Sequence, residues 1–250
     1  MELINSDCIE YLKSVPRESF DICLTSPPYN MNLRIRNGKH CSRQIVKEIS
    51  TKYTGFSDNL SMDELFVFNC NVIDELLRVS KINFYNIQFL TGNKSAFFRI
   101  MGKYHDRIKE VIIWDKINAQ PSISERTLNS QFEVLLVLEG EAISRRFKKA
   151  NFTKGTLSNV LRIPRGKKYC PTHGASFPIE LADTIISNFS NIGDRVLDPF
   201  MGTGTTGASS LSLGRSFVGV EIDKGYFELS KERLEIISSN ISHTEAMMEL

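Results

Sequence analysis

The sequence lacks the usual features of secreted and membrane proteins. Its 250 residues contain only five cysteines, widely spaced and without a Cys-x-x-Cys pair, which argues against a disulfide framework and predicts a reducing, cytoplasmic environment. No apolar run approaches the length of about 18 residues that spans a bilayer, and the start of the chain has neither the basic region nor the apolar stretch of a signal peptide. We therefore predict no membrane partner.

Metal ligands and net charge are equally scarce. The chain has four histidines, and although Cys170 and His173 have ligand-like spacing, no second pair completes a zinc site, so no metal is predicted. The formal net charge of +2 indicates no particular partner. With 41% hydrophobic and 24% charged residues the composition is that of a globular protein, and we predict a single domain over 1–250.

Predicted strands and helices alternate along the chain. This alternation predicts an α/β fold with a mainly parallel sheet and helices on both faces. Three irregular stretches (31–58, 115–131 and 139–172) are long enough to be functional or mobile loops, and about ten residues at the end are expected to fray. Helices are predicted at 9–14, 62–80, 178–189, 205–213 and 224–238, and strands at 21–25, 83–90, 111–114, 132–138, 195–198 and 216–221.

A glycine-rich turn joins the predicted strand 195–198 to the helix that follows it. Gly202 and Gly204 allow a tight turn and a close approach of the backbone to a ligand, while the helix N-terminus favours an anionic group. Glu221 ends the next predicted strand, where an acid can accept both hydroxyls of a ribose. These features predict a site for a nucleoside-bearing cofactor. A nicotinamide dinucleotide site, or a turn without any ligand, would give the same pattern.

A Ser-Pro-Pro-Tyr segment at 26–29 follows the predicted strand 21–25. Its prolines fix the backbone and remove two N–H donors, so that the carbonyl of Pro27 can point into a cleft as an acceptor. Ser26 adds a hydroxyl and Tyr29 a flat ring. This group suits a flat heterocycle with an exposed amine, stacked on the tyrosine and hydrogen-bonded to the serine oxygen and the carbonyl. A rigid turn that only ends the strand is the alternative.

With both segments in place, the chain resembles the amino-methyltransferases of DNA. Residues 26–29 match the family's catalytic motif, (D/N/S)PP(Y/F), and residues 198–205 match its DPF-G-G(S/T) cofactor motif. The catalytic motif comes first and the cofactor motif last, an order that resembles the permuted beta group. The resemblance implies a circularly permuted, Rossmann-like fold that binds S-adenosyl-L-methionine and releases S-adenosyl-L-homocysteine.

The resemblance also implies the roles of individual residues. The methyl group would pass to the exocyclic amine of a base that is flipped out of double-stranded DNA. Asp7 and Cys8 resemble the segment that holds the cofactor's adenine, and Phe177 lies in one that resembles the closing segment on the methionine side. The predicted catalytic residues are Ser26, Pro27, Pro28 and Tyr29. The predicted cofactor-binding residues are Asp7, Cys8, Phe177, Asp198, Pro199, Phe200, Gly202, Gly204, Thr205, Glu221 and Ile222.

The identity of the methylated base depends on the first residue of the catalytic motif. In the family, Asp at this position goes mostly with adenine and Ser mostly with cytosine, so Ser26 favours N4 of cytosine and leaves N6 of adenine as the alternative. The resemblance further implies a role in restriction–modification or in the protection of phage or host DNA. A cognate restriction endonuclease and a second copy of the chain are the other expected partners.

Two basic segments are candidates for DNA binding, and both are expected to flank the cleft. Residues 142–172 include nine basic and no acidic residues, and residues 31–52 include six basic residues and one acidic residue. Clustered cations interleaved with aromatic residues suit a phosphate backbone, although a solvated loop is the alternative. We predict that 139–172 is an inserted target-recognition segment and 31–58 a mobile loop. The predicted DNA-binding residues are Asn30, Arg34, Arg36, Arg145, Arg146, Lys148, Arg165 and Lys167.

Two other functions stay open at this point. A nicotinamide-dependent oxidoreductase would explain the glycine-rich turn and Glu221, but not the segment 26–29. A catalytically silent DNA-binding module would bind DNA without transferring a methyl group. RNA and protein are also open as substrates, since a fold of this kind does not fix its substrate.

Overall fold

One eight-stranded sheet organises the chain. The structure is a computed structural model that describes residues 1–30, 34–36, 39–41, 60–120, 125–140, 144–166 and 176–248. The strands of this sheet follow the order β1-β10-β9-β2-β5-β7-β6-β8, and every neighbouring pair is parallel except the two that involve β7. The strands are β1 (Glu2–Asn5), β2 (Phe20–Thr25), β5 (Ser80–Ile87), β6 (Ile108–Gln120), β7 (Ser130–Glu139), β8 (Val160–Arg162), β9 (Arg195–Asp198) and β10 (Ser216–Glu221), while β3 (Arg34–Arg36) and β4 (Lys39–Cys41) form a separate antiparallel hairpin.

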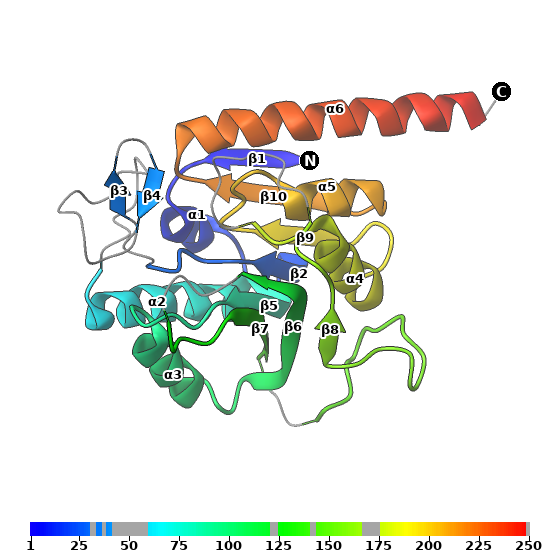
Figure 1. Cartoon of the computed structure of the whole chain (residues 1–250). Helices are drawn as coiled ribbons and strands as arrows, with labels where there is room; N and C mark the ends of the chain where they lie inside the picture. The colour runs from blue at the N-terminus through cyan, green and yellow to red at the C-terminus, as the bar shows by residue number, and fades with distance from the viewer. Residues whose placement is uncertain are drawn as a thin grey trace.

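Helices cover both faces of the sheet (Figure 1). Phe20 and Cys23 of β2 belong to the core on one face, and Ile22 and Leu24 belong to the core on the other, which explains why this strand is a nearly continuous apolar run. Among the described residues, no helix is long and apolar enough to cross a membrane. The first core contains residues of α1 (Cys8–Ser14), α2 (Met62–Val79) and α3 (Lys94–Lys103), and the second contains residues of α4 (Ile179–Phe189), α5 (Thr205–Ser212) and α6 (Lys224–Met248).

The carboxyl ends of the parallel strands meet at one edge of the sheet, where ligands of α/β proteins usually bind. β2 ends at Thr25, β9 at Asp198 and β10 at Glu221, and these three strands lie in the order β10-β9-β2. The segment after β2 therefore lies beside the glycine-rich turn after β9, although Thr25 and Asp198 are 173 positions apart in the sequence. The fold brings the two motifs together at this carboxyl edge.

The predicted fold class is confirmed, and the differences concern individual elements. The short elements β1, α3 and β8 are absent from the prediction, and β3 and β4 lie within the predicted loop 31–58. β5 begins at residue 80 rather than 83. β6 continues to Gln120, into a stretch predicted to be irregular, because it pairs with β7 across a bulge. α6 continues to Met248, beyond its predicted end at 238 and into the stretch expected to fray.

Candidate active site

A cavity of about 1010 Å³, including its open mouth, lies at the carboxyl edge of the sheet. Gly204 is the one predicted cofactor residue that does not line it: this glycine precedes α5 in the left-handed conformation, with φ of 78°. The predicted residues that do line the cavity are Asp7, Cys8, Ser26, Pro27, Pro28, Tyr29, Phe177, Asp198, Pro199, Phe200, Gly202, Thr205, Glu221 and Ile222.

Asp198 connects the two motif segments. Its Oδ1 accepts hydrogen bonds from the Thr25 hydroxyl (2.6 Å) and from the backbone N–H of Phe200 (3.1 Å). Its Oδ2 accepts a hydrogen bond from the hydroxyl of Thr206 (2.6 Å), in the first turn of α5. Burial raises the pKa of Asp198 to about 6, although these three donors act in the opposite direction. One buried carboxyl group thus holds β2, the glycine-rich turn and α5 together.

Glu221 supports the glycine-rich turn from the neighbouring strand. Its Oε2 accepts a hydrogen bond from the backbone N–H of Gly202 (2.8 Å), and its Oε1 accepts one from the backbone N–H of Asp223 (2.9 Å). Each oxygen keeps a lone pair that can accept a hydroxyl hydrogen of a ribose. Burial, with smaller contributions from the Asp223 and Asp198 carboxylates, raises the pKa of Glu221 to about 7.

Asp7 and Cys8 line the cavity on the side of Glu221. Asp7 lies there as the N-cap of α1, and its Oδ1 accepts hydrogen bonds from the backbone N–H groups of Ile9 (2.8 Å) and Glu10 (3.0 Å). Burial raises the pKa of the Cys8 thiol well above its usual range, so this side chain is a neutral wall residue rather than a nucleophile. A wall of this kind suits the flat face of a heterocycle.

The segment 26–29 is held through the hydroxyl of Tyr29. This oxygen lies 2.6 Å from Ser26 Oγ, 2.9 Å from Glu133 Oε2 and 2.7 Å from Asn86 Nδ2. The side-chain amide of Asn93 donates to the backbone carbonyl of Tyr29 (2.7 Å). Burial, followed by the Glu133 carboxylate, raises the pKa of Tyr29 well above its usual range, so the hydroxyl keeps its proton.

Asn30, which was predicted to contact DNA, has a different environment. Its side chain is completely buried and is not part of the cavity wall. Its amide donates to the backbone carbonyl of Leu60 (2.8 Å) and its carbonyl accepts from the Leu60 N–H (2.8 Å). These bonds join the chain on the two sides of residues 31–59, and they indicate a structural role.

Several cavity residues are absent from the prediction. Phe68 is the most distant in sequence: it comes from α2, where it is one of many apolar residues at helical spacing, and its ring centroid lies 6.1 Å from that of Phe200. Met201 and Thr203 lie inside the matched cofactor motif 198–205, and the remaining three directly adjoin predicted residues. Among the described residues, no group of His, Cys, Asp and Glu side chains could hold a metal ion. The additional lining residues are Ser6, Phe68, Ser176, Met201, Thr203 and Thr206.

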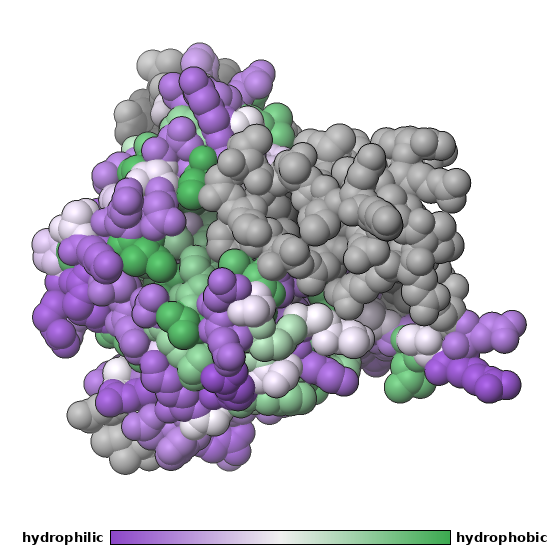
Figure 2. All heavy atoms as spheres, turned by 90° about the vertical axis from the view of Figure 1, so that its left-hand side faces the viewer, coloured by the Kyte–Doolittle hydropathy of each residue, from purple (hydrophilic) through white to green (hydrophobic). Residues whose placement is uncertain are grey.

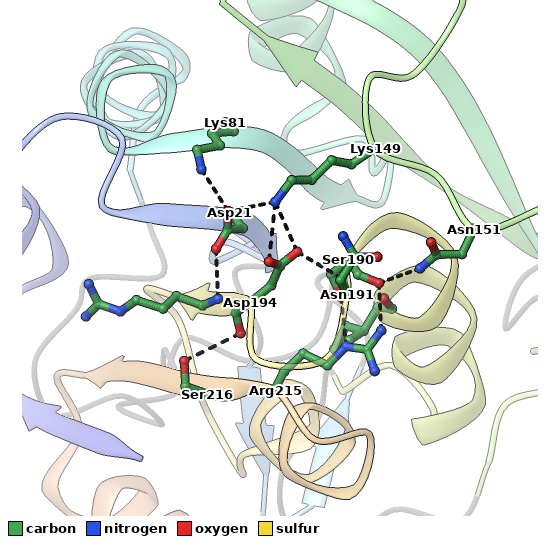
Figure 3. Close-up of polar contacts among 11 residues, drawn as sticks. Asp21, Lys81, Lys149, Asn151, Ser190, Asn191, Asp194, Arg215 and Ser216 are labelled. Atoms are coloured by element: carbon green, nitrogen blue, oxygen red, sulfur yellow. Dashed lines mark hydrogen bonds and ion pairs between the residues drawn. The ribbon is translucent and has the colours of Figure 1, made fainter.

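The first part of the basic segment does not flank the cavity. Lys149 donates to Asp21 near the start of β2 (3.1 Å) and to Asp194 just before β9 (3.3 Å), which places it at the amino edge of the sheet (Figure 3). The ring of Phe147 packs edge-on against Phe189 at the end of α4, with 4.9 Å between the centroids. This part of the segment is therefore anchored at the edge opposite the cavity.

Acids from neighbouring strands also reduce the positive charge of the segment. Arg145 pairs with Glu110 near the start of β6 (2.9 Å), and Arg162 pairs with Asp115 on the same strand (3.4 Å). The sequence count of basic residues therefore overstates the charge that is available to DNA phosphates.

The end of the segment lies near the cavity. Gly166 packs closely against Pro178, because a Cβ added to this glycine would lie only 3.1 Å from the Pro178 Cβ. Phe177, which directly precedes Pro178, lines the cavity. Arg165 is exposed at this position. Of the remaining predicted DNA-binding residues, Arg146 and Lys148 are exposed, Arg34 and Arg36 are described only in their backbone, and Lys167 lies outside the described residues.

Comparison with known proteins accounts for this arrangement. A family model described as DNA methylase matches residues 20–232. The chain belongs to the N6/N4 DNA methylase family. It is thus an S-adenosylmethionine-dependent DNA methyltransferase, and the nicotinamide-dependent alternative is set aside.

Individual relatives of this methyltransferase cover nearly its whole length. It is 28% identical to the Type II methyltransferase M.HinfI of Haemophilus influenzae, in an alignment that covers 98% of this chain and 71% of the relative. Its fold matches that of PvuII DNA methyltransferase (cytosine-N4-specific), with a TM-score of 0.70, 17% identity and coverage of 96% and 91%. It also matches a protein of Thermus thermophilus solved in complex with S-adenosyl-L-methionine, with a TM-score of 0.64, 23% identity and coverage of 95% and 94%.

The affinity for S-adenosylmethionine is expected to fall as the pH drops below about 7. Protonation of Glu221, whose pKa is about 7, replaces a hydroxyl acceptor by a neutral carboxyl group. If only the ionised form binds, the dissociation constant measured by calorimetry rises about tenfold between about pH 8 and pH 6. In Glu221→Gln, which cannot titrate, the constant is weaker at pH 8 and changes little with pH. A wild-type constant that is flat over this range would contradict the assigned role.

Proposed function

We propose that this methyltransferase modifies N4 of cytosine in double-stranded DNA. The observation that carries the proposal is Ser26 at the first position of the catalytic motif, which in this family goes mostly with cytosine. Ser26 lines the cavity together with Pro27 and Tyr29, and its oxygen can accept a hydrogen bond from an exocyclic amine.

In the proposed mechanism, positioning and hydrogen bonding supply most of the catalysis. The lone pair of an exocyclic amine is delocalised into the ring, so the amine is a poor nucleophile. Ser26 Oγ and the carbonyl of Pro27 accept its hydrogens, which favours a tetrahedral nitrogen and frees the lone pair for in-line attack. The glycine-rich turn and Glu221 would hold S-adenosylmethionine, which would supply the electrophilic methyl group. The N–C bond would form as the S–C bond breaks, S-adenosylhomocysteine would leave as the neutral thioether, and the methylated amine would lose one proton to water. The ring of Tyr29 stacks on the flipped base.

We further propose that DNA approaches the carboxyl edge of the sheet. Arg165 directly precedes Gly166, which packs against Pro178 next to the cavity-lining Phe177, whereas Arg145 and Lys149 lie at the amino edge. The face of the molecule shown in Figure 2 is mainly hydrophilic in its described part, with smaller apolar areas between the polar residues. A mainly hydrophilic surface suits a polar partner better than an apolar one.

The biological role that we propose is restriction–modification. The relative M.HinfI is a Type II methyltransferase, which supports a cognate restriction endonuclease as the functional partner. Protection of phage or host DNA and the association of two copies of the chain stay predictions from the sequence.

Mass spectrometry of methylated DNA tests the proposed substrate. Purified protein incubated with labelled S-adenosylmethionine and double-stranded DNA should produce N4-methylcytosine, and N6-methyladenine in its place would overturn the choice of base.

Pro27→Ala and Tyr29→Ala should lower turnover by about a hundredfold or more while cofactor binding survives, since both change only the acceptor side of the site. Full activity of Tyr29→Ala would contradict the stacking role.

A pair of basic variants tests the proposed DNA surface. Arg165→Ala should weaken DNA binding by about threefold to tenfold and lower the salt dependence by about one phosphate contact. Lys149→Ala, the matched control at the amino edge, should keep its DNA affinity and lose only some stability. The binding constants can be measured by fluorescence anisotropy at several salt concentrations. A greater loss of affinity in Lys149→Ala than in Arg165→Ala would refute the assignment.

A further inference from the structure

A buried polar cluster lies behind the catalytic motif, outside the cavity wall. Glu133 on β7 is its centre: its Oε1 lies 2.7 Å from Lys116 Nζ on β6, and its Oε2 lies 2.9 Å from the hydroxyl of Tyr29. The side chains of Lys116 and Glu133 are only 5% and 10% exposed. Burial of such a pair brings little net stability, because the loss of hydration offsets most of the attraction. The location of this pair against a catalytic tyrosine therefore suggests a role other than stabilisation.

The chemistry of the cluster fixes the direction of its hydrogen bonds. A carboxylate paired with an ammonium group can only accept, so the Tyr29 hydroxyl must donate its single proton to Glu133. In the hydrogen bond of 2.6 Å between the two hydroxyl groups of Ser26 and Tyr29, Ser26 then has to be the donor. As a result the Ser26 oxygen keeps only lone pairs for the cavity.

Asn86 on β5 supports the same direction. Its Nδ2 donates to Glu133 Oε2 (2.6 Å) and to the Tyr29 oxygen (2.7 Å), so the tyrosine oxygen acts as an acceptor toward both Asn86 and Ser26. This orientation leaves the buried Oδ1 of Asn86 without a hydrogen-bond partner among the described residues. The opposite orientation would place that oxygen against the Glu133 carboxylate, which is also an acceptor. Since Glu133 can only accept, the amide nitrogen rather than the amide oxygen of Asn86 has to face it.

We propose that Glu133, held by Lys116, is a positioning residue for methyl transfer. A serine hydroxyl can donate or accept a hydrogen bond, unlike a carboxylate, and only an accepting oxygen frees the lone pair of the target amine. By orienting the Tyr29 hydroxyl, Glu133 makes Ser26 a permanent acceptor. The inference rests on the proposed role of Ser26 toward an exocyclic amine, and it applies to cytosine and adenine alike.

The test compares two buried ion pairs on the same two strands. The double variant Lys116→Met with Glu133→Met removes the cluster's charges and retains side chains of similar length. The matched control is Lys109→Met with Glu139→Met, which removes an ion pair at the other end of β6 and β7. In this pair Lys109 Nζ also lies 2.7 Å from Glu139 Oε2, and the two side chains are 3% and 11% exposed. We expect kcat on DNA to fall about tenfold to a hundredfold in the first variant, with the KM for DNA and the Kd for S-adenosylmethionine within about twofold of wild type. The control should keep its kcat.

Tyr29→Phe separates positioning from a structural role. This variant removes only the hydroxyl and leaves the ion pair intact, so it should lose about as much kcat as the Lys116/Glu133 variant. When both changes are combined, the loss should be no greater than for either alone, because Glu133 acts through that hydroxyl. Additive losses, an equal loss in the Lys109/Glu139 control, or a full kcat in Tyr29→Phe would each overturn the inference. The wild-type rate on DNA tests the proposed function itself, and the ratios between variants test the role of Glu133, so the two failures are distinguishable.

Discussion

The hydrogen bonds of Asp198 are the interaction on which the site depends. Thr25 ends β2 and immediately precedes the catalytic segment, and Asp198 ends β9 and immediately precedes the glycine-rich turn. A bond of 2.6 Å between them joins the segment that we propose holds the acceptor base to the turn that we propose holds the methyl donor. Because transfer needs the two reactants aligned to within a fraction of an ångström, a rigid link at this point constrains everything that lies beyond it.

Two buried carboxyl groups at the same cavity have an electrostatic consequence. Burial raises the pKa of Asp198 to about 6 and that of Glu221 to about 7, so each ionised form is less favourable in the folded protein than in the unfolded chain. Each group therefore costs stability as the pH rises from its ordinary value toward these raised values. A cationic ligand favours the ionised forms, and S-adenosylmethionine carries a sulfonium charge. Ionisation of the site and binding of the cofactor should thus promote each other.

The sequence predicts best what depends on local patterns. The turn around Gly202 and the buried strand β2 follow from residue types at short spacing, and the matched motifs place them in one cavity. Glu133 and Lys116 could not be found in this way, because only the antiparallel pairing of β6 with β7 brings them together, and no spacing along the chain encodes that contact.

Charge and proximity to a motif were weaker guides. Lys149 belongs to a run of basic residues, yet it binds Asp21, 128 positions away in the sequence, and therefore lies at the amino edge. Asn30 directly follows the catalytic motif, yet its side chain is buried, where it forms two hydrogen bonds with the backbone of Leu60. Its backbone has a positive φ. In both cases a partner distant in sequence decides where the side chain lies, and composition carries no information about that partner.

The most direct test of the account is the single-turnover rate of Thr25→Val with saturating S-adenosylmethionine. Valine fills the same volume but cannot donate to Asp198, while the bonds of the carboxylate to Phe200 and Thr206 remain. We expect a methyl-transfer rate at least about tenfold lower, with the Kd for the cofactor within about threefold of wild type. An unchanged rate, or an equal loss of rate and cofactor affinity, would contradict the claim that this bond aligns the two halves of the site.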